Sequence, residues 1–316
     1  MTTSMILLVP VLVLAVVGLL AFAGCASFEA AEDTTPTPTP PVTEPTPPVV
    51  TPPPVVTPPP PVAKNYPEII LAEPGLRCYW RLTEAAGAVT AVDSEPTLPQ
   101  AGTYVDTIEG VGGALALGKL TMDTAVNFDA ISSHVEVPYH EQVNPPLNFS
   151  VEVWIRPDLN SDTPNTIVGS YNPQNFQGFI LELLRQGGVT TARARIGDGS
   201  KFTTLQVGIG DGTVNDGWRH LVMTYESNGT KLKLYCNAGT TLHTSELPTP
   251  AIPAAVNYIP VQGPIGPSFR IGAGRLTSAN TPPRLGFRGR IDEVALYDRA
   301  LAVTAITKHY DTALAP

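Results

Sequence analysis

The sequence has few of the residues from which metal-dependent and nucleophilic enzymes build their sites. It contains 3 cysteines and 5 histidines in 316 residues, and no C-x-x-C pair occurs, so a zinc site is not expected. The G-x-S-x-G elbow of many serine hydrolases is also missing. No stripe of basic residues follows residue 64 and the net charge is −9, which excludes nucleic acid as an expected partner.

The one long apolar run lies at the start of the chain and ends in Leu20-Ala-Phe-Ala-Gly-Cys25. A run of this length is able to span a bilayer or to act as an export signal. The end of the run resembles a bacterial lipobox, in which Cys25 receives the lipid. Phe22 and the absence of Lys or Arg before the run depart from that motif, so an uncleaved anchor and ordinary secretion remain alternatives. All three interpretations place the rest of the chain outside the cytoplasm, and Ala26 after the cysteine favours, by resemblance, the outer membrane.

A proline-rich segment separates this signal from the folded part. Of the 34 prolines, 14 fall between Pro36 and Pro61, where they favour extended polyproline II over helix. The sequence therefore predicts a signal segment at 1–25, a disordered linker at 26–64 and one domain at 65–316.

The clearest folding signal in that domain is a predicted hairpin around Ser227-Asn228-Gly229. Residues 218–225 and 231–236 alternate in the manner of strands, and Asn-Gly between two such runs favours a tight turn. The first run has few polar residues on either face, which is typical of a central strand. Further strand-like runs follow one another at the spacing of an antiparallel sandwich, residues 244–268 are interpreted as a long surface loop, and residues 301–314 as a short helix.

Several segments resemble laminin-G-like domains, which have a concanavalin A-like jelly-roll fold. The matching segments stand in the order Cys78–Glu84, Phe149–Pro157, Trp218–Gly239, Phe269–Gly274 and Phe287–Leu301. This resemblance implies an all-β jelly roll of two antiparallel sheets, with the last long strand beside the first. The family consists mostly of binding and adhesion scaffolds.

The resemblance also implies one structural calcium ion where the first and last strands meet. Asp292 is the main candidate ligand, and Glu84 and Asp93 are further candidates. In the alternative interpretation, Asp292 accepts backbone hydrogen bonds and Asp93 caps a turn.

Two cysteines remain if Cys25 carries lipid. Cys78 and Cys236 each fall on the apparent core-facing side of a strand, and pairs outside the cytoplasm often form disulfides. A bridge requires Cα atoms within about 7 Å. A disulfide and two buried thiols are both compatible with the sequence.

The same fold hosts glycoside hydrolases, which need two carboxyl groups about 5 to 9.5 Å apart. No E-x-D-x-x-E strand occurs, and Glu152, Glu182 and Glu226 lie on different predicted strands. These residues are interpreted as solvated strand positions, and the chain as a non-enzyme.

Binding is therefore the predicted function, with an extracellular glycan or glycoprotein as the partner. Aromatic residues in or beside predicted loops are candidates for stacking on sugars: Tyr139, Tyr171, Phe176, Tyr258 and Phe287. The alternatives are an adhesive envelope protein that binds a protein partner and an atypical glycosidase.

Overall fold

The computed structural model describes residues 64–117, 120–129, 132–158, 165–210, 217–228, 231–237, 243–246, 258–261, 269–274 and 286–315. Cys25, the rest of the predicted signal segment and the linker up to residue 63 lie outside these ranges. No helix within them is long and apolar enough to cross a membrane.

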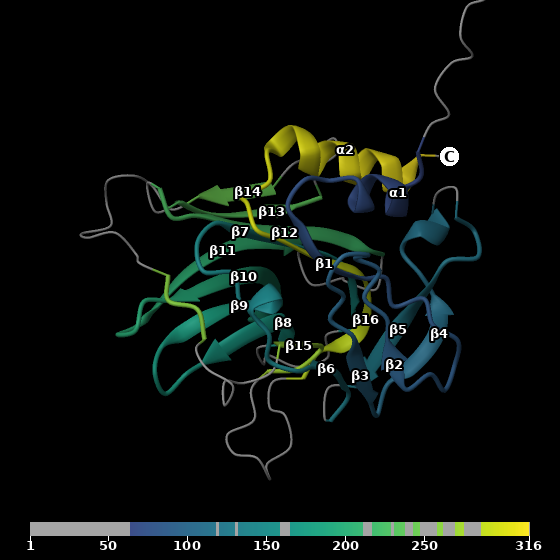
Figure 1. The fold of residues 1–316 in the computed structure, drawn as a ribbon, viewed down its shortest axis with the longest axis horizontal. Helices are drawn as coiled ribbons and strands as arrows, with labels where there is room; N and C mark the ends of the chain where they lie inside the picture. Colours follow the sequence, from purple (N-terminus) through teal and green to yellow (C-terminus); the bar gives the residue numbers. More distant parts are fainter. Residues whose placement is uncertain are drawn as a thin grey trace, which may run out of the picture. The chain divides into compact units, whose positions relative to one another are not determined.

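The strands form two antiparallel sheets, as predicted (Figure 1). Sheet A has the order β14 (His243–Glu246), β13 (Lys231–Cys236), β12 (Arg219–Glu226), β7 (Phe149–Pro157), β16 (Arg288–Tyr297), β5 (Thr124–Asp129) and β4 (Ile108–Gly112), and β1 (Leu76–Trp80) also pairs with β16. Sheet B has the order β11 (Phe202–Gly210), β10 (Val189–Gly197), β9 (Gln177–Gln186), β8 (Asn165–Asn172), β15 (Phe269–Ile271), β6 (His134–Val137), β3 (Gly102–Val105) and β2 (Thr90–Ala91). The predicted pairing of the last strand with the first is confirmed by β16 and β1.

The predicted hairpin corresponds to β12 and β13. β12 lies between β7 and β13, so its interpretation as a central strand is confirmed. Its inward side chains, such as Leu221 and Met223, are fully buried, and so is the outward Val222. Apolar residues on both faces of this strand fit a position in the middle of a sheet that is covered on both sides.

The main core lies between the two sheets and follows the period-2 pattern of the strands. Phe149, Val151, Val153 and Ile155 of β7 all point into it. Trp80 of β1 in sheet A stacks on Phe269 of β15 in sheet B, with 5.1 Å between ring centroids. Contact between aromatic rings from opposite sheets stabilises the sandwich beyond the area that they bury.

A second core covers the outer face of sheet A, beneath two helices (Figure 1). These are α1 (Tyr66–Leu71) and α2 (Val303–Leu314). Asn65 and Glu68 form a capping box that starts α1, whereas Ala302 provides no side-chain cap for α2. The C-terminal helix was predicted, and its first turn relies on tertiary contacts.

Three elements differ from the prediction. α1 was not predicted, although the sequence Asn65-Tyr-Pro-Glu68 carries the capping-box pattern. β4 was not predicted either, and β14 overlaps the start of residues 244–268, which were interpreted as a surface loop. Both strands are short and lie at the edges of sheet A, where little apolar periodicity is required.

The structure decides between the two interpretations of the cysteines. Cys78 and Cys236 are buried free thiols. Strands β16, β7 and β12 separate β1 from β13, which places the two cysteines roughly 19 Å apart at about 4.8 Å per strand. A disulfide between them is therefore wrong for this fold. Burial raises the pKa of the Cys236 thiol to about 12.

Candidate functional site

A β-bulge in β16 brings two consecutive acidic residues into one buried group. The register of β16 against β7 shifts between Asp292 and Ala295, and Glu293 has a φ of 52°. Neighbouring side chains of a regular strand point to opposite faces, and a bulge re-aims one of them. As a result, carboxylate oxygens of Asp292, Glu293 and Asp123 lie within 4.8 Å of one another.

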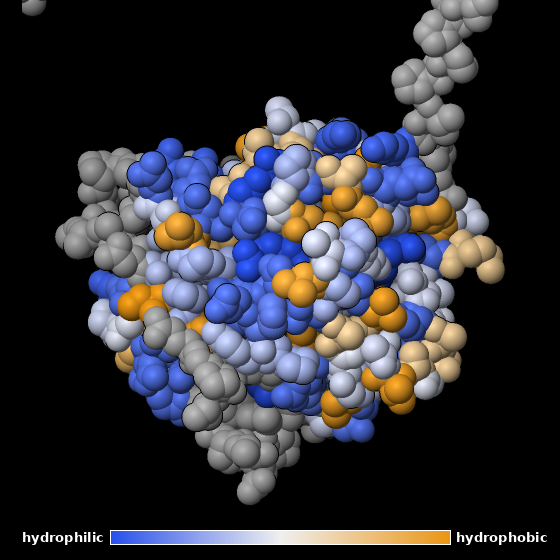
Figure 2. All heavy atoms as spheres, viewed as in Figure 1, coloured by the Kyte–Doolittle hydropathy of each residue, from blue (hydrophilic) through white to orange (hydrophobic). Residues whose placement is uncertain are grey.

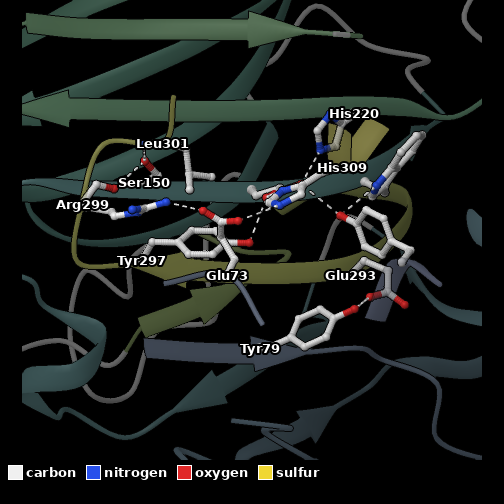
Figure 3. Close-up of polar contacts among 12 residues, drawn as sticks. Glu73, Tyr79, Ser150, His220, Glu293, Tyr297, Arg299, Leu301 and His309 are labelled. Carbon is white, nitrogen blue, oxygen red and sulfur yellow. Dashed lines mark hydrogen bonds and ion pairs between the residues drawn. The ribbon is translucent and has the colours of Figure 1, made fainter. Parts of the chain in front are cut away.

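The surroundings compensate these three carboxylates only in part. The backbone N–H of Ala114 donates to Asp292 Oδ2 at 2.7 Å, and Arg81 is 3.4 Å from Glu293 and 3.7 Å from Asp123. The Tyr79 hydroxyl donates to Glu293 (Figure 3). Burial raises the pKa of Asp292, and the neighbouring Asp123 raises it further. One arginine therefore faces three buried acids.

This arrangement could hold a metal ion, and its oxygen ligands are of the kind that calcium takes. Among the described residues, no hydrogen-bond partner faces the buried Oδ1 atoms of Asp123 and Asp292. Calcium binds oxygen at 2.3–2.6 Å, so ligand oxygens on opposite sides of the ion lie about 4.6 to 5.2 Å apart. Gly113 keeps the space open, because a Cβ there would lie 2.3 Å from Asp123 Oδ2 and 2.9 Å from Asp292 Oδ2. We call Asp123, Asp292 and Glu293 the acidic triad.

Asp292 is the only sequence-predicted ligand in this triad. Asp93 accepts hydrogen bonds from the backbone N–H groups of Tyr79, Glu95 and Gln100, so it organises a turn. Glu84 accepts from the backbone of Val92 and from the Tyr104 hydroxyl. Two members of the triad were not predicted from the sequence: Asp123, which directly precedes β5, and Glu293, which a regular strand pattern directs to the other face.

The outer face of sheet B carries a second polar group. Glu182 of β9 is fully buried and lies opposite Arg193 of β10. Its Oε1 accepts from Arg193 Nη2 at 2.8 Å and from Arg195 Nη1 at 3.5 Å. The interpretation of Glu182 as a solvated strand position was therefore wrong, because the guanidinium groups of the neighbouring strand cover it.

Aromatic side chains adjoin this polar group at the end of β11. The ring of Phe202 lies 5.6 Å from that of Phe176 and 6.1 Å from that of Tyr171, between centroids. Arg195 lies over the Phe202 ring, with its Cζ 5.0 Å from the centroid. Phe176 is 37% exposed. We call Tyr171, Phe176 and Phe202 the aromatic cluster.

A backbone contact holds Phe176 in place. The residue has a φ of 49°, and its carbonyl accepts from the N–H of Gly199 at 2.8 Å. Gly197 allows this approach, because a Cβ there would lie 2.1 Å from the Phe176 oxygen. The β8–β9 turn is thus attached to the end of β10, which keeps the aromatic ring beside Phe202.

The other predicted aromatic residues do not join this cluster. Tyr258 and Phe287 are buried in the core between the sheets. Tyr139 is half-buried and lines a separate cavity of about 550 Å³ with Arg77 and Val261. Among the five predicted residues, only Tyr171 and Phe176 therefore lie at the aromatic cluster, and Phe202 was missed.

Glu152 occupies the centre of a buried hydrogen-bond network on the outer face of sheet A. It is fully buried and accepts from His220 Nε2 at 2.7 Å and from the Tyr297 hydroxyl at 2.9 Å. His309 Nδ1 of α2 lies 2.9 Å from Glu152 Oε2, and the Tyr66 hydroxyl of α1 donates at 3.1 Å. In Figure 3, His220, His309 and Tyr297 point towards one common region. The interpretation of Glu152 as solvated was wrong, because α1 and α2 cover this face.

The network also shifts the pKa values of its members. Burial alone would raise the pKa of Glu152, but His309 and His220 outweigh burial and hold that pKa well below its ordinary value. Burial alone would lower the pKa of His309, but the carboxylates of Glu152 and Glu73 raise it above its ordinary value. The ion pair between Glu152 and His309 therefore joins α2 to sheet A.

We expect a pH-dependent stability from these shifts. The contribution of His309 is complete below its unfolded pKa of about 6.5 and decreases as pH rises through the higher folded pKa. That of Glu152 is complete above about pH 4.3 and decreases as pH falls through its lower folded pKa. Urea unfolding of the wild type should therefore show greater stability near pH 6 than at pH 9. The raised pKa values of the buried Asp292 and Glu293 add to the alkaline decrease. His309→Gln should therefore make the decrease smaller without abolishing it, and an identical decrease in the variant would contradict the assignment.

The acidic residues considered for catalysis do not converge. Glu152 lies on the outer face of sheet A and Glu182 on the outer face of sheet B, with the core between them. Packed sheets are about 10 Å apart, and the two side chains point away from each other. Glu226 ends β12 in sheet A. Glu152 and Glu182 therefore cannot act as a pair on one glycosidic bond.

Comparisons with known proteins agree with this architecture. The binding domain of botulinum neurotoxin serotype D/C VPI 5993 is similar at TM-score 0.53 and 10% identity, over 76% of this chain and 52% of that one. The serotype D binding domain is similar at TM-score 0.52 and 15% identity, over 75% and 51%. The CBM40 of a Ruminococcus gnavus sialidase, bound to sialyllactose, has a TM-score of 0.43 and 12% identity, over 58% and 94%. This chain spans about half the length of the neurotoxin domains, and no curated protein matches it.

A laminin G family model, described as the concanavalin A-like lectin/glucanases superfamily, matches residues 129–307. This range is more than half of the chain, and it contains both the bulge of β16 and the aromatic cluster. The chain therefore belongs to the concanavalin A-like lectin/glucanases superfamily.

Proposed function

We propose that the protein is a non-catalytic carbohydrate-binding module. The observation that carries this proposal is the aromatic cluster on sheet B, beside the guanidinium groups of β10. The faces of aromatic rings carry partial negative charge, which attracts the C–H groups on a sugar ring, while guanidinium N–H groups hydrogen-bond to oxygen at its edge. The superfamily includes both lectins and glucanases, and the separation of Glu152 from Glu182 supports binding rather than hydrolysis by this pair.

The surface also favours a polar ligand over a large protein partner. On the face of the molecule that Figure 2 draws, hydrophobic residues are scattered among hydrophilic ones and form no single broad patch. Protein-binding surfaces often contain larger contiguous apolar patches. Binding to a protein partner is the alternative function. It would be supported if the protein bound no glycan on the array and an envelope protein co-purified with it.

We expect Phe202→Ala to weaken binding to oligosaccharides found on a glycan array. Loss of one stacking ring should lower affinity at least tenfold, or about 1.4 kcal/mol, in calorimetric titration. Leu98→Ala, which truncates another exposed apolar side chain, is the matched control. Equal affinities for Phe202→Ala and the wild type would place the sugar elsewhere, and release of reducing sugar by the wild type would support the glycosidase alternative.

The same proposal includes an extracytoplasmic, membrane-anchored location. Cys25 would carry the lipid, and the linker 26–64, at roughly 3.1 Å per residue in polyproline II, would hold the domain on the order of 100 Å from the membrane. Radiolabelled palmitate should enter the wild type and not Cys25→Ser. Equal labelling of the two proteins would refute lipidation at this cysteine.

A further inference from the structure

Two arginines stand side by side on the outer face of sheet B. Arg193 and Arg195 are two residues apart on β10, so their side chains leave the same face roughly 6.6 Å apart. Their side chains are 18% and 33% exposed, whereas the Glu182 side chain that pairs with both is 1% exposed. The guanidinium groups therefore form the accessible surface above a buried carboxylate.

Within the described ranges, most of the hydrogen-bonding capacity of these two arginines is unused. A guanidinium has five N–H donors in a planar fork. Arg193 donates to Glu182 at 2.8 Å, and Arg195 makes only a long contact of 3.5 Å to the same oxygen. In the part of the chain that the structure describes, Nε of Arg193, Nε of Arg195 and the hydroxyl of Thr166 are buried without a hydrogen-bond partner. Leaving a buried donor unpaired costs about 1 to 3 kcal/mol, so ligand oxygens that accept from the guanidinium N–H groups would stabilise this group.

The charge of the group indicates which oxygens it binds. Two guanidinium groups face one carboxylate, so the group is net positive on a chain whose net charge is −9. Carboxylate and sulfate oxygens match the guanidinium fork and form stronger hydrogen bonds than hydroxyl groups do. An isolated cationic group of this kind on an acidic protein favours an anion over a neutral ligand.

The adjoining ring supplies the other half of a saccharide site. Arg195 lies over the Phe202 ring, with 5.0 Å between its Cζ and the centroid, and a stacked guanidinium keeps the N–H groups at its edge available. Phe176 extends the apolar surface away from the arginines. Anion contacts and stacking contacts thus lie next to each other at one end of sheet B.

We propose that this face binds an acidic saccharide, with Arg193 and Arg195 holding a carboxylate or sulfate group and Phe202 packing against the sugar ring. This inference rests on the proposed carbohydrate-binding function and adds the ligand class and the residues that select it. Glu182 orients the two guanidinium groups from below and is a positioning residue.

Matched pairs of oligosaccharides test the inference. The probes are a galacturonate trimer and its methyl ester, and a sulfated galactose oligosaccharide and its unsulfated form, each titrated calorimetrically into the full protein. We expect at least tenfold tighter binding of one charged member than of its neutral partner, with an affinity that decreases as salt increases. The two pairs distinguish a carboxylate from a sulfate ligand.

Variants separate charge recognition from stacking. Arg193→Gln and Arg195→Gln should lower the affinity for the charged probe to that for the neutral one, and Arg195→Lys should restore only part of it, because lysine lacks the planar fork. Lys231→Gln removes the same formal charge from sheet A and should change nothing. Phe202→Ala should lower the affinity for the charged probe, but the variant should still bind the charged probe more tightly than the neutral one. Unchanged thermal unfolding of Arg195→Gln establishes that it is folded.

The outcomes also separate this inference from the proposed function. If charged and neutral probes bind equally and Phe202→Ala still lowers the affinity for both, the ligand is not specifically acidic. The proposed carbohydrate-binding function would then stand. A charge preference that survives both Arg→Gln substitutions would overturn the assignment to β10. Absence of binding to every saccharide would overturn both proposals.

Discussion

Replacing Glu152 with alanine should destabilise the protein by about 3 to 5 kcal/mol, the range measured when one member of a buried ion pair is removed. The substitution removes the only carboxylate that His220, Tyr297 and Tyr66 share. His309 keeps only the more distant Glu73, at 3.6 Å. The His220 and Tyr297 donors would then lack this acceptor, and the ion pair between α2 and sheet A would be lost. α1 would keep only the hydrogen bond from Trp154 Nε1 to the Tyr66 hydroxyl. Urea unfolding followed by tryptophan fluorescence measures the effect, because Trp154 packs against His220.

A second acidic residue of sheet A provides the control for this prediction. Glu226→Ala removes a carboxylate from the half-exposed end of β12 and should change stability by no more than about 0.5 kcal/mol. Glu152→Gln keeps the side-chain volume and one acceptor oxygen, so its free energy of unfolding should lie between those of Glu152→Ala and Glu226→Ala. A loss below about 1 kcal/mol in Glu152→Ala would show that hydration replaces the network and that α2 is held by apolar contacts alone.

The β-sandwich was predictable because each of its long strands is specified by a pattern of residues that are close together in the sequence. Alternation in residues 149–157 and 218–236 specifies strands that bury one face against the other sheet. The capping box at Asn65 is equally local and was a usable signal for α1. β14 was not predictable in the same way, because a short edge strand is defined by pairing with β13 rather than by its own pattern.

The sites were less predictable because they depend on departures from local pattern. Glu293 reaches Asp292 only through a bulge and a positive φ, whereas alternation places consecutive residues on opposite faces. Asp123 joins them from a distant segment of the chain. Glu152 appeared solvated because the sequence does not reveal that α1 and α2 cover its side of the sheet.

Calcium should raise the melting temperature of the protein through the acidic triad. A ligand at a thousandfold its Kd stabilises the folded state by about 4 kcal/mol, which corresponds to roughly 8 to 16 °C for a domain of this size. Asp292→Asn should abolish the shift, because the amide provides one neutral oxygen in place of a carboxylate. Differential scanning calorimetry in excess calcium and in EDTA measures both proteins. Asp311→Asn on the exposed side of α2 is the control and should retain the full shift.

The behaviour without metal distinguishes an ion site from a purely structural group of acids. If the triad exists to hold a cation, Asp292→Asn should be at least as stable as the wild type in EDTA, because it removes repulsion between buried carboxylates. If Asp292 serves only to accept a hydrogen bond from the N–H of Ala114, calcium should not change the melting temperature of either protein. Terbium provides an independent readout, because Tyr79 donates to Glu293 and would sensitise the luminescence of an ion bound there. Sensitised emission that calcium displaces in the wild type and that Asp292→Asn lacks is the expected result, and equal emission from both proteins would place the ion elsewhere.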